Sequence, residues 1–315
     1  MSSQNTPQTQ TDISLLDRLF ALLLHLLPHH LLSQIMHWQT RCEWRPLKNG
    51  LIRAVIKLYK VDMSLAEQAD PESYPTFNAF FTRSLKPEVR PISGDAADIV
   101  SPVDGAVSQT GDIVDGRIFQ AKGQSYTLAE LLGSDSDWTA RFSDGKFATI
   151  YLSPRDYHRI HMPCAGELKR MLHIPGRLFS VSPSTTRAVP RLFSRNERVV
   201  NLFETDVGPM AVIMVGAIFV ASMDTVWAGT VAPISQRINQ WDYQELPKSP
   251  IRLAKGEEMG RFNMGSTVIL LFGKQAVAWA ESLQPEAKVE MGQIIANTAA
   301  EQQVINTTTE REEPE

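Results

Sequence analysis

The tetrapeptide Met264-Gly265-Ser266-Thr267 is the first feature of this 315-residue sequence that could do chemistry. It stands at the mouth of an apolar run, residues 268–272. A serine hydroxyl is a weak nucleophile until an adjacent base activates it, and a preceding glycine lets the backbone bend without a Cβ penalty. Short Gly-Ser-Thr turns are common, so the tetrapeptide alone predicts only a turn that leads into a strand.

A pair of histidines, His158 and His161, lies upstream between Pro154 and Pro163. Imidazole is the side chain whose unperturbed pKa lies near neutrality, so the pair suits proton transfer. A zinc site needs further ligands, and the chain has only two cysteines, which form no Cys-x-x-Cys pair. We therefore expect no metal at these histidines. Farther upstream, Asp104 precedes a glycine, which by itself indicates a turn.

Three stretches, in this order, resemble the bacterial, membrane-associated type of phosphatidylserine decarboxylase. They are Val103-Asp104-Gly105 after a proline, residues 157–163 with the sequence Tyr-His-Arg-Ile-His-Met-Pro, and Gly265-Ser266-Thr267. The likeness runs from about residue 77 to about residue 292 and also includes residues 77–83, 121–123, 196–198, 203–217 and 255–262. The family usually has leucine where this chain has Met264, a residue of similar volume and polarity.

The resemblance implies an enzyme that makes its own cofactor. Ser266 would attack the carbonyl of Gly265 to give an ester, and loss of the Ser266 α-proton would then cut the chain into a β chain, 1–265, and an α chain, 266–315. Ser266 would end as a covalent pyruvoyl group, and the two chains would form a heterodimer, with further dimerisation left open. In the family pattern His161 is the base, and Asp104 holds it in the required tautomer.

The resemblance also implies the reaction, in which phosphatidylserine becomes phosphatidylethanolamine. The substrate amine would form a Schiff base with the pyruvoyl group, which takes up electrons as CO2 leaves. A general acid must then return a proton to the α-carbon. His158 and His161 are both candidates for that acid, and the sequence does not choose between them. His158 could instead position its neighbour.

The net charge of −4 is unevenly distributed. Residues 1–60 carry seven Lys/Arg against three Asp/Glu, a net charge of +4, and they include a leucine-rich segment interrupted by Asp17, Arg18 and Pro28. No uninterrupted apolar stretch approaches the roughly 20 residues that a spanning helix needs. These residues either pack as amphipathic helices on the protein's own core or anchor it at a membrane interface, where Lys and Arg meet anionic headgroups.

A lipid substrate favours the anchor, so we expect a peripheral protein on the inner cell membrane. Two cysteines are too few for a disulfide framework, which indicates the cytoplasmic side. The first twelve residues contain no Lys or Arg, and a secretory signal with a basic start is therefore not expected.

The pattern predicts an α+β fold. We expect N-terminal amphipathic helices in residues 1–65, a mostly antiparallel β core in residues 66–296, and a disordered acidic tail in residues 297–315. Apolar residues recur at helical spacing from Leu51 to Tyr59 and predict a helix there, and residues 77–83 predict a short aromatic one. Strands are expected at 106–109, 147–152, 199–203, 211–223 and 268–272, and short helical pieces at 126–132 and 190–193.

Two other functions remain open on the sequence. A pyruvoyl-dependent decarboxylase acting on a soluble amino acid would share the Gly265-Ser266 bond but would not need the basic, leucine-rich N-terminal end. A peripheral membrane-binding protein with a decayed active site is opposed by the presence of Asp104, His161 and Ser266. Nucleic-acid binding is not expected, because residues 61–315 carry a net charge of −8 and no basic stretch interleaved with aromatic residues.

Overall fold

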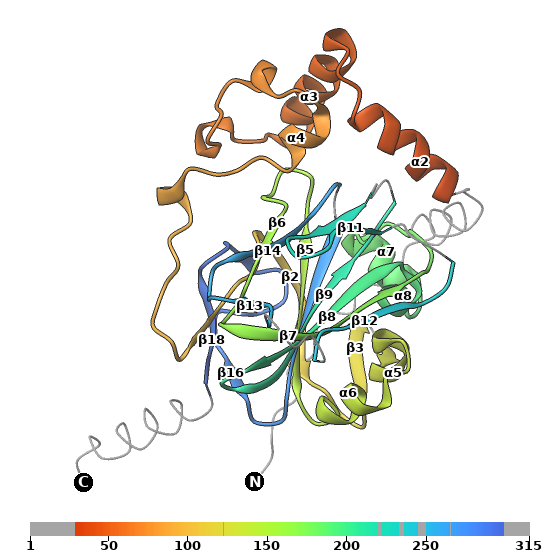
Figure 1. Ribbon diagram of the computed structural model, residues 1–315, viewed down its shortest axis with the longest axis vertical. Helices are drawn as coiled ribbons and strands as arrows, with labels where there is room; N and C mark the ends of the chain where they lie inside the picture. The colour runs from red at the N-terminus through yellow and green to blue at the C-terminus, as the bar shows by residue number, and fades with distance from the viewer. Residues whose placement is uncertain are drawn as a thin grey trace.

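The computed structural model describes residues 29–121, 123–218, 222–232, 236–244, 250–264 and 266–298. A β core forms most of the molecule, and an N-terminal helical part, α2 to α4, lies beyond one end of the core (Figure 1). The helices are α2 (His29–Thr40), α3 (Arg45–Tyr59), α4 (Phe77–Phe81), α5 (Leu128–Leu132), α6 (Ser136–Arg141), α7 (Pro183–Ala188) and α8 (Leu192–Arg195). Short 3-10 helices are η1 (Met63–Leu65), η2 (Pro71–Ser73) and η3 (Pro87–Val89).

The strands form sheets in which every pairing between named strands is antiparallel. The main sheet has the order β12-β7-β8-β9-β15-β5-β2-β17, with β13 paired to β7. Its strands are β2 (Gly105–Asp112), β5 (Lys146–Leu152), β7 (Gly166–Ile174), β8 (Arg198–Thr205), β9 (Gly208–Val215), β12 (Asn239–Asp242), β13 (Arg252–Leu253), β15 (Ser266–Phe272) and β17 (Lys288–Val289).

Three smaller sheets complete the core. One, in the order β11-β10-β14-β6, consists of β6 (Arg159–His161), β10 (Met223–Thr225), β11 (Gly229–Ala232) and β14 (Glu258–Phe262). Another, in the order β1-β18-β16, consists of β1 (Asp98–Val100), β16 (Val277–Trp279) and β18 (Ile294–Thr298). The third is the pair β3 (Arg117–Ala121) and β4 (Gln124–Thr127).

The strand that begins with Ser266 lies in the middle of the main sheet. β15 pairs with β9 on one side and β5 on the other, and all seven of its residues are buried. A strand covered on both faces needs a nearly continuous apolar sequence, and residues 268–272 supply it. The apolar run thus fixes the position of Ser266, the polar residue at its start.

The helical part has a small hydrophobic core of its own. Ile52 of α3 packs with the aromatic residues Phe77, Phe80 and Phe81 of α4, and Met264 packs against this cluster from the β core. None of the helices in the described ranges has the length and hydropathy that a bilayer crossing requires. The leucine-rich segment before His29 lies outside the described residues.

The α+β fold with an antiparallel core and N-terminal helices is confirmed. Some local predictions were wrong at their edges. Tyr126 lies in β4, because Thr127 caps α5 with a capping box and starts the helix at Leu128. The second predicted helical piece starts at Leu192 rather than at residue 190.

The apolar run predicted to span residues 211–223 ends as a strand at Val215, and the chain re-enters a different sheet at Met223. At the C-terminal end β18 extends to Thr298, two residues into the predicted tail. The remainder of that tail lies outside the described residues.

Candidate active site

Ser266 is fully buried as the first residue of β15, where it pairs with Leu152 of β5. Its Oγ has no hydrogen-bond partner among the described residues. A buried hydroxyl without a partner is uncommon in proteins and calls for an explanation such as a catalytic role. Gly265, the residue before it, lies outside the described residues.

The turn before Ser266 is conformationally strained. Met264 has a φ of 151°, in a region that side-chain-bearing residues rarely adopt and that costs about 1–3 kcal/mol. Such strain persists only where the surrounding structure holds it, and it concentrates at functional sites. The strain therefore lies within two residues of the expected nucleophile.

His158 is placed beside this turn by main-chain bonding. The segment from Leu152 to His158 connects β5 to β6, and the turn from Phe262 to Ser266 connects β14 to β15. Ser266 pairs with Leu152 at one end, and the Phe262 N–H donates to the His158 carbonyl at the other, over 3.1 Å. The two connections therefore run alongside each other, with His158 at the level of the turn.

His158 is a neutral base with a free nitrogen. Its side chain is fully buried, lies 4.1 Å from the Phe81 ring between centroids, and donates from Nδ1 to the Asp156 carbonyl over 2.8 Å. Burial lowers the pKa of His158 to about 3. Nε2 carries the lone pair and has no partner in the described part of the chain, so it is free to accept a proton.

Both ring nitrogens of His161 are occupied. Nδ1 donates to the Gly256 carbonyl over 2.9 Å, which leaves Nε2 as the acceptor for the Tyr157 hydroxyl at 3.0 Å. Burial lowers the pKa of His161 and raises that of Tyr157, so the phenol stays protonated and donates. Because His161 lies three residues beyond His158 along extended chain, its position is about 10 Å farther along that chain from the turn before Ser266.

The backbone conformation and close packing at position 256 require a glycine. Its φ is +78°, and a Cβ there would lie 2.5 Å from the Ile92 side chain. A residue with a side chain would be strained and would clash in this position. Glycine therefore lets the main chain adopt the conformation in which the Gly256 carbonyl accepts a hydrogen bond from the His161 ring.

Asp104 is buried, and its carboxylate accepts hydrogen bonds from groups other than His161. Its Oδ1 accepts from Arg90 Nε over 2.9 Å and from the Met291 N–H over 2.8 Å, and its Oδ2 accepts from Arg90 Nη2 over 2.7 Å. Such bidentate arginine–carboxylate pairs are among the strongest ion pairs, and the hydrogen bonds to Asp104 raise the pKa of Arg90. The main chain at Gly105, next to Asp104, packs closely against β5, since a Cβ on Gly105 would lie 2.5 Å from the Tyr151 carbonyl oxygen.

The structure brings Asp104 and His161 near each other without a direct hydrogen bond between them. The main-chain N–H of His161 donates to the Pro102 carbonyl over 2.9 Å. Burial lowers the pKa of His161, and the Asp104 charge raises it by a smaller amount. Ser266 shares no hydrogen bond with His161 or His158. The relay of Asp104, His161 and Ser266 therefore stays a prediction.

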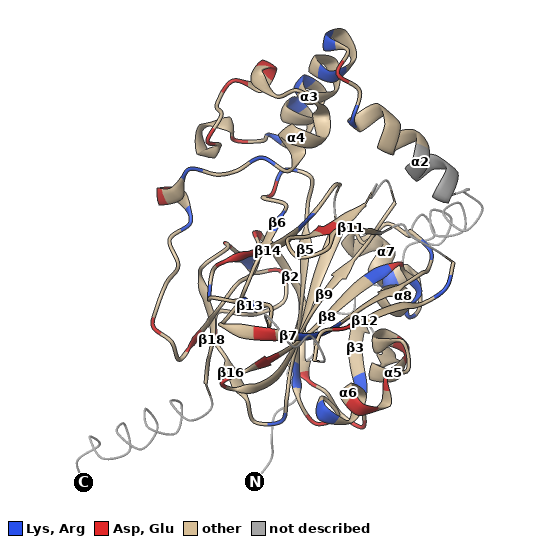
Figure 2. Cartoon of the chain, viewed as in Figure 1, with Lys and Arg blue, Asp and Glu red and all other residues tan. Residues whose placement is uncertain are grey.

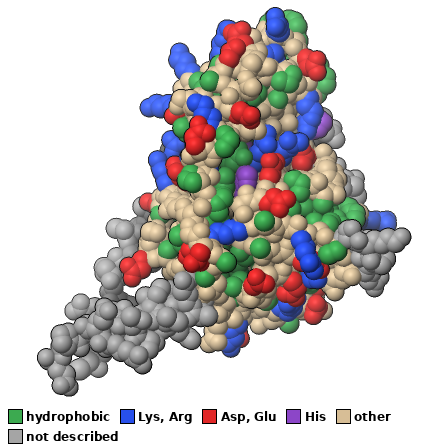
Figure 3. All heavy atoms as spheres, turned by 60° about the vertical axis from the view of Figure 1, so that its left-hand side comes forward, with side chains coloured by type: hydrophobic (Ala, Val, Ile, Leu, Met, Phe, Trp, Pro, Cys, Tyr) green, Lys and Arg blue, Asp and Glu red, His purple; other side chains and the backbone are tan. Residues whose placement is uncertain are grey.

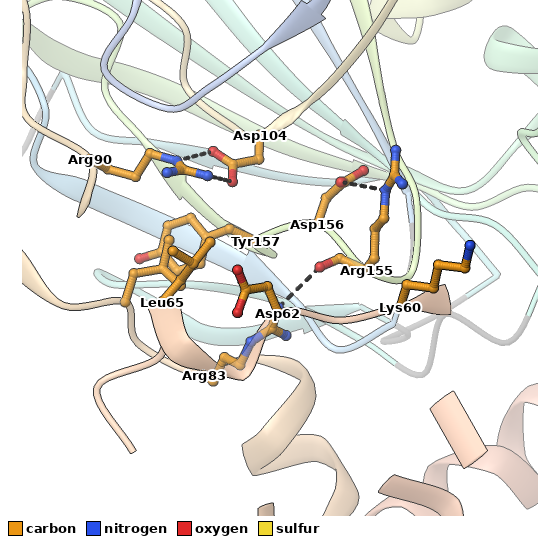
Figure 4. A pocket seen from close by; sticks show the side chains of 10 residues that line it. Lys60, Asp62, Leu65, Arg83, Arg90, Asp104, Arg155, Asp156 and Tyr157 are labelled. Carbon is orange, nitrogen blue, oxygen red and sulfur yellow. Dashed lines mark hydrogen bonds and ion pairs between the residues drawn. The ribbon is translucent and has the colours of Figure 1, made fainter. Parts of the chain in front are cut away.

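A cavity of about 160 Å³ opens beside these groups (Figure 4). Asp104 and Tyr157 line it together with charged residues from the helical part and the β5–β6 connection, namely Lys60, Asp62, Arg83, Arg90, Arg155 and Asp156. On the molecular surface a histidine side chain lies in a hollow with charged side chains of both signs around it (Figure 3). Mixed charges of this kind suit a ligand that itself carries both signs.

Sequence reasoning missed three residues of this site. Tyr157 and Asp156 lie inside the stretch singled out around the histidines, so proximity in sequence could have indicated them. Arg90 gave no signal, because an arginine fourteen residues before Asp104 has no spacing that predicts an ion pair. Within the described ranges no three His, Cys, Asp or Glu side chains are grouped to hold a metal ion.

Comparison with known proteins places the chain among relatives of a single family. The family model described as phosphatidylserine decarboxylase matches residues 77–297, and a second model described as PSD matches residues 19–60. A phosphatidylserine decarboxylase proenzyme from Azotobacter vinelandii is 53% identical over 283 residues, which cover 90% of this chain and 99% of the relative.

Two further relatives carry the same name. The protein from Alkalilimnicola ehrlichii is 59% identical over 256 residues, covering 81% of this chain and 88% of its own. The one from Pseudomonas aeruginosa is 52% identical over 284 residues, covering 90% and 98%. The chain therefore belongs to the phosphatidylserine decarboxylase family.

Proposed function

We propose that this decarboxylase is made as a precursor that cuts its own backbone between Gly265 and Ser266, and that Ser266 becomes a pyruvoyl group. The enzyme converts phosphatidylserine to phosphatidylethanolamine and CO2, as its family implies. The observation that carries the proposal is the buried Ser266 Oγ, which has no partner within the described ranges. A water-poor site lets a hydroxyl react with its own backbone without competition from solvent.

Self-cleavage proceeds in two stages. Ser266 Oγ adds to the Gly265 carbonyl carbon and gives its proton to a base, after which the C–N bond breaks and the freed amine takes up a proton. Removal of the Ser266 α-proton then expels the Gly265 carboxylate and leaves dehydroalanine at position 266. Water replaces its nitrogen, which departs as ammonia, and a ketone remains.

His161 serves as the base in this proposal, and Asp104 stabilises its charged form. Burial lowers the pKa of His161, and the charge of the nearby Asp104 carboxylate opposes that shift. In the conformation described, Nε2 of His161 accepts from Tyr157 and Asp104 accepts from Arg90. The Tyr157 hydroxyl must therefore turn away from Nε2, and the His161 ring must come closer to the turn, before His161 can take a proton from Ser266.

The buried position of Ser266 fits the pyruvoyl group, because Leu152 and the strands beside β15 enclose the residue from which it forms. Once formed, this group supplies the electron sink for the loss of CO2. The chain's own contribution is proton transfer. His158 Nε2 is unprotonated and has no partner in the described part of the chain, so it can accept a hydrogen bond from the substrate amino group and, once protonated, give a proton to the α-carbon.

Denaturing mass spectrometry of the purified protein should show two chains, residues 1–265 and 266–315. The smaller chain should begin with pyruvoyl instead of serine, and its N-terminus should therefore resist Edman degradation. Protein denatured immediately after synthesis should still contain the intact precursor. A single intact chain in protein that decarboxylates phosphatidylserine would contradict the proposal.

We also propose that the helical part lies on the membrane. Large apolar side chains are exposed there, with Trp38 at 67%, Trp44 at 66% and Leu58 at 73%. Residues 29–60 carry six Lys/Arg against one Glu, a net charge of +5, and Figure 2 shows several of these basic residues on α3. Apolar side chains with basic neighbours favour binding to an anionic bilayer surface.

Replacing Trp38, Trp44 and Leu58 with Ser should weaken binding to vesicles of anionic lipid roughly tenfold or more, because less apolar surface then enters the bilayer. Vesicle co-sedimentation measures the binding, and added salt should weaken wild-type binding further by screening the basic residues. A matched control replaces Val114 and Phe119, exposed apolar residues of the β core, with Ser. Equal binding by the two variants would place the membrane contact elsewhere.

A further inference from the structure

The turn that carries the scissile bond has little freedom of its own. Phe262 ends β14 in one sheet and Ser266 begins β15 in another, so three residues cross between two sheets. Both flanking residues are bonded to the Leu152–His158 connection, as described above. Whatever fixes Asn263 and Met264 therefore decides how the Gly265 carbonyl meets the Ser266 hydroxyl.

Asn263 is the most tightly bonded residue of this turn. It is fully buried, and its N–H donates to the Ser222 carbonyl over 3.0 Å. Its side-chain Nδ2 donates to Ser222 Oγ over 2.6 Å, while its Oδ1 accepts from Asn78 Nδ2 over 3.0 Å. An amide bonded at both ends cannot rotate, so the Asn263 side chain fixes the backbone from which Met264 departs.

The partners of Asn263 connect the turn to the helical part. Asn78 lies in α4, and Ser222 Oγ accepts a second bond, of 3.1 Å, from Arg41 Nη2 just after α2. Burial lowers the pKa of Arg41, whose Nη1 has no partner in the described part of the chain. With Met264 packed on the α3–α4 cluster, the turn is attached to the helical part by polar and apolar contacts together.

We propose that Asn263 is a positioning residue for self-cleavage, and that the hydrogen-bonded chain Asn78–Asn263–Ser222–Arg41 holds the strained turn in the geometry that attack requires. The inference rests on the proposed cleavage between Gly265 and Ser266. An intramolecular attack depends steeply on alignment, and a misplacement of about 1 Å costs roughly 100-fold in rate. Asn263 touches neither reacting atom and acts through the backbone of Met264.

The test compares two substitutions at one position. Asn263→Leu keeps the size of the side chain and removes its two side-chain hydrogen bonds, while the main-chain bond to Ser222 remains possible. We therefore expect self-cleavage about 10-fold to 100-fold slower than in wild type. Asn263→Asp keeps an acceptor for Asn78 and offers a second one to the Ser222 hydroxyl, with Arg41 near to balance the charge. We expect this variant to cleave within about fivefold of wild type.

The rate is the loss of precursor with time, followed on denaturing gels after synthesis. Unfolding midpoints are measured for each variant with Ser266→Ala added, so that all the proteins compared are uncleaved. The control is Asn201→Leu, at another fully buried asparagine, whose Nδ2 donates to the Val212 carbonyl within the main sheet. Asn78→Asp removes the Nδ2 donor at the other end of the same hydrogen-bonded chain, at a half-buried side chain. It keeps the inference testable if Asn263→Leu does not fold.

Three results would overturn the inference while the proposed function stands. They are wild-type cleavage by Asn263→Leu or, where that variant does not fold, by Asn78→Asp; equal slowing by Asn201→Leu; and an Asn263→Asp rate as low as that of Asn263→Leu. Each requires that wild-type protein cleaves in the same assay. A wild-type chain that stays intact would instead overturn the proposed self-cleavage, and the role of Asn263 with it.

Discussion

Replacing Ser266 with Ala should leave the chain intact indefinitely, because alanine has no hydroxyl to attack the Gly265 carbonyl. Replacing His161 with Ala or Asp104 with Asn should instead slow self-cleavage, by a factor of roughly 10² to 10⁴ that is typical of a lost proton-transfer group. His161→Ala removes the base, and Asp104→Asn removes the charge that stabilises its protonated form. Precursor and product are quantified by denaturing gel or mass spectrometry.

The control for this series is Ser194→Ala, at a serine that bonds the Arg191 carbonyl in α8, away from the turn. It should mature like wild type. Normal maturation of His161→Ala would remove His161 from the role of base. It would point to His158, whose Nε2 already has no partner among the described residues.

Asp104→Asn has a second consequence that the structure makes specific. The carboxylate holds Arg90 through two hydrogen bonds and accepts a third from the Met291 main chain. Asparagine can keep only part of this arrangement, since its amide NH2 would face a guanidinium. Unfolding midpoints of the uncleaved proteins therefore separate a structural loss at Arg90 from a chemical loss at His161.

Most of the fold could be predicted because its strongest elements have simple patterns. Residues 268–272 form an unbroken apolar run, and the central position of β15 requires one. Apolar residues between Leu51 and Tyr59 recur at helical spacing, and α3 covers them. The run from residue 211 gave too long a strand, because hydrophobicity does not show that the chain leaves the main sheet after Val215.

The site could be predicted only in part. Family motifs indicated Asp104, His158, His161 and Ser266, but their hydrogen bonds depend on segments far apart in the sequence. Arg90 reaches Asp104 through a loop, and the Gly256 carbonyl that holds His161 comes from 95 residues away. The three-residue spacing of the histidines does not show that the two rings differ: of His158 and His161, only His158 has a ring nitrogen without a partner in the described part of the chain.

Replacing His158 with Ala should allow at least partial self-cleavage while slowing decarboxylation by roughly 10² to 10⁴. His158 lies beside the turn with a buried, unprotonated Nε2, so its loss removes the group that carries the proton to the α-carbon. Turnover is measured as CO2 release from phosphatidylserine vesicles and is divided by the amount of matured chain. That division keeps incomplete cleavage from being counted as slow chemistry.

The pH dependence gives a second check on His158. Burial lowers the pKa of His158 to about 3, so the side chain is neutral across the range from about pH 5 to pH 8. The fold-loss in His158→Ala should therefore be nearly constant over that range, whereas a histidine titrating near its usual value would give a loss that changes with pH. Phe81→Leu, which removes the aromatic ring packed on His158 but keeps an apolar side chain in the α3–α4 cluster, serves as the control and should lose much less activity. Normal turnover per matured chain in His158→Ala would reduce His158 to a structural residue and leave His161 as the proton donor.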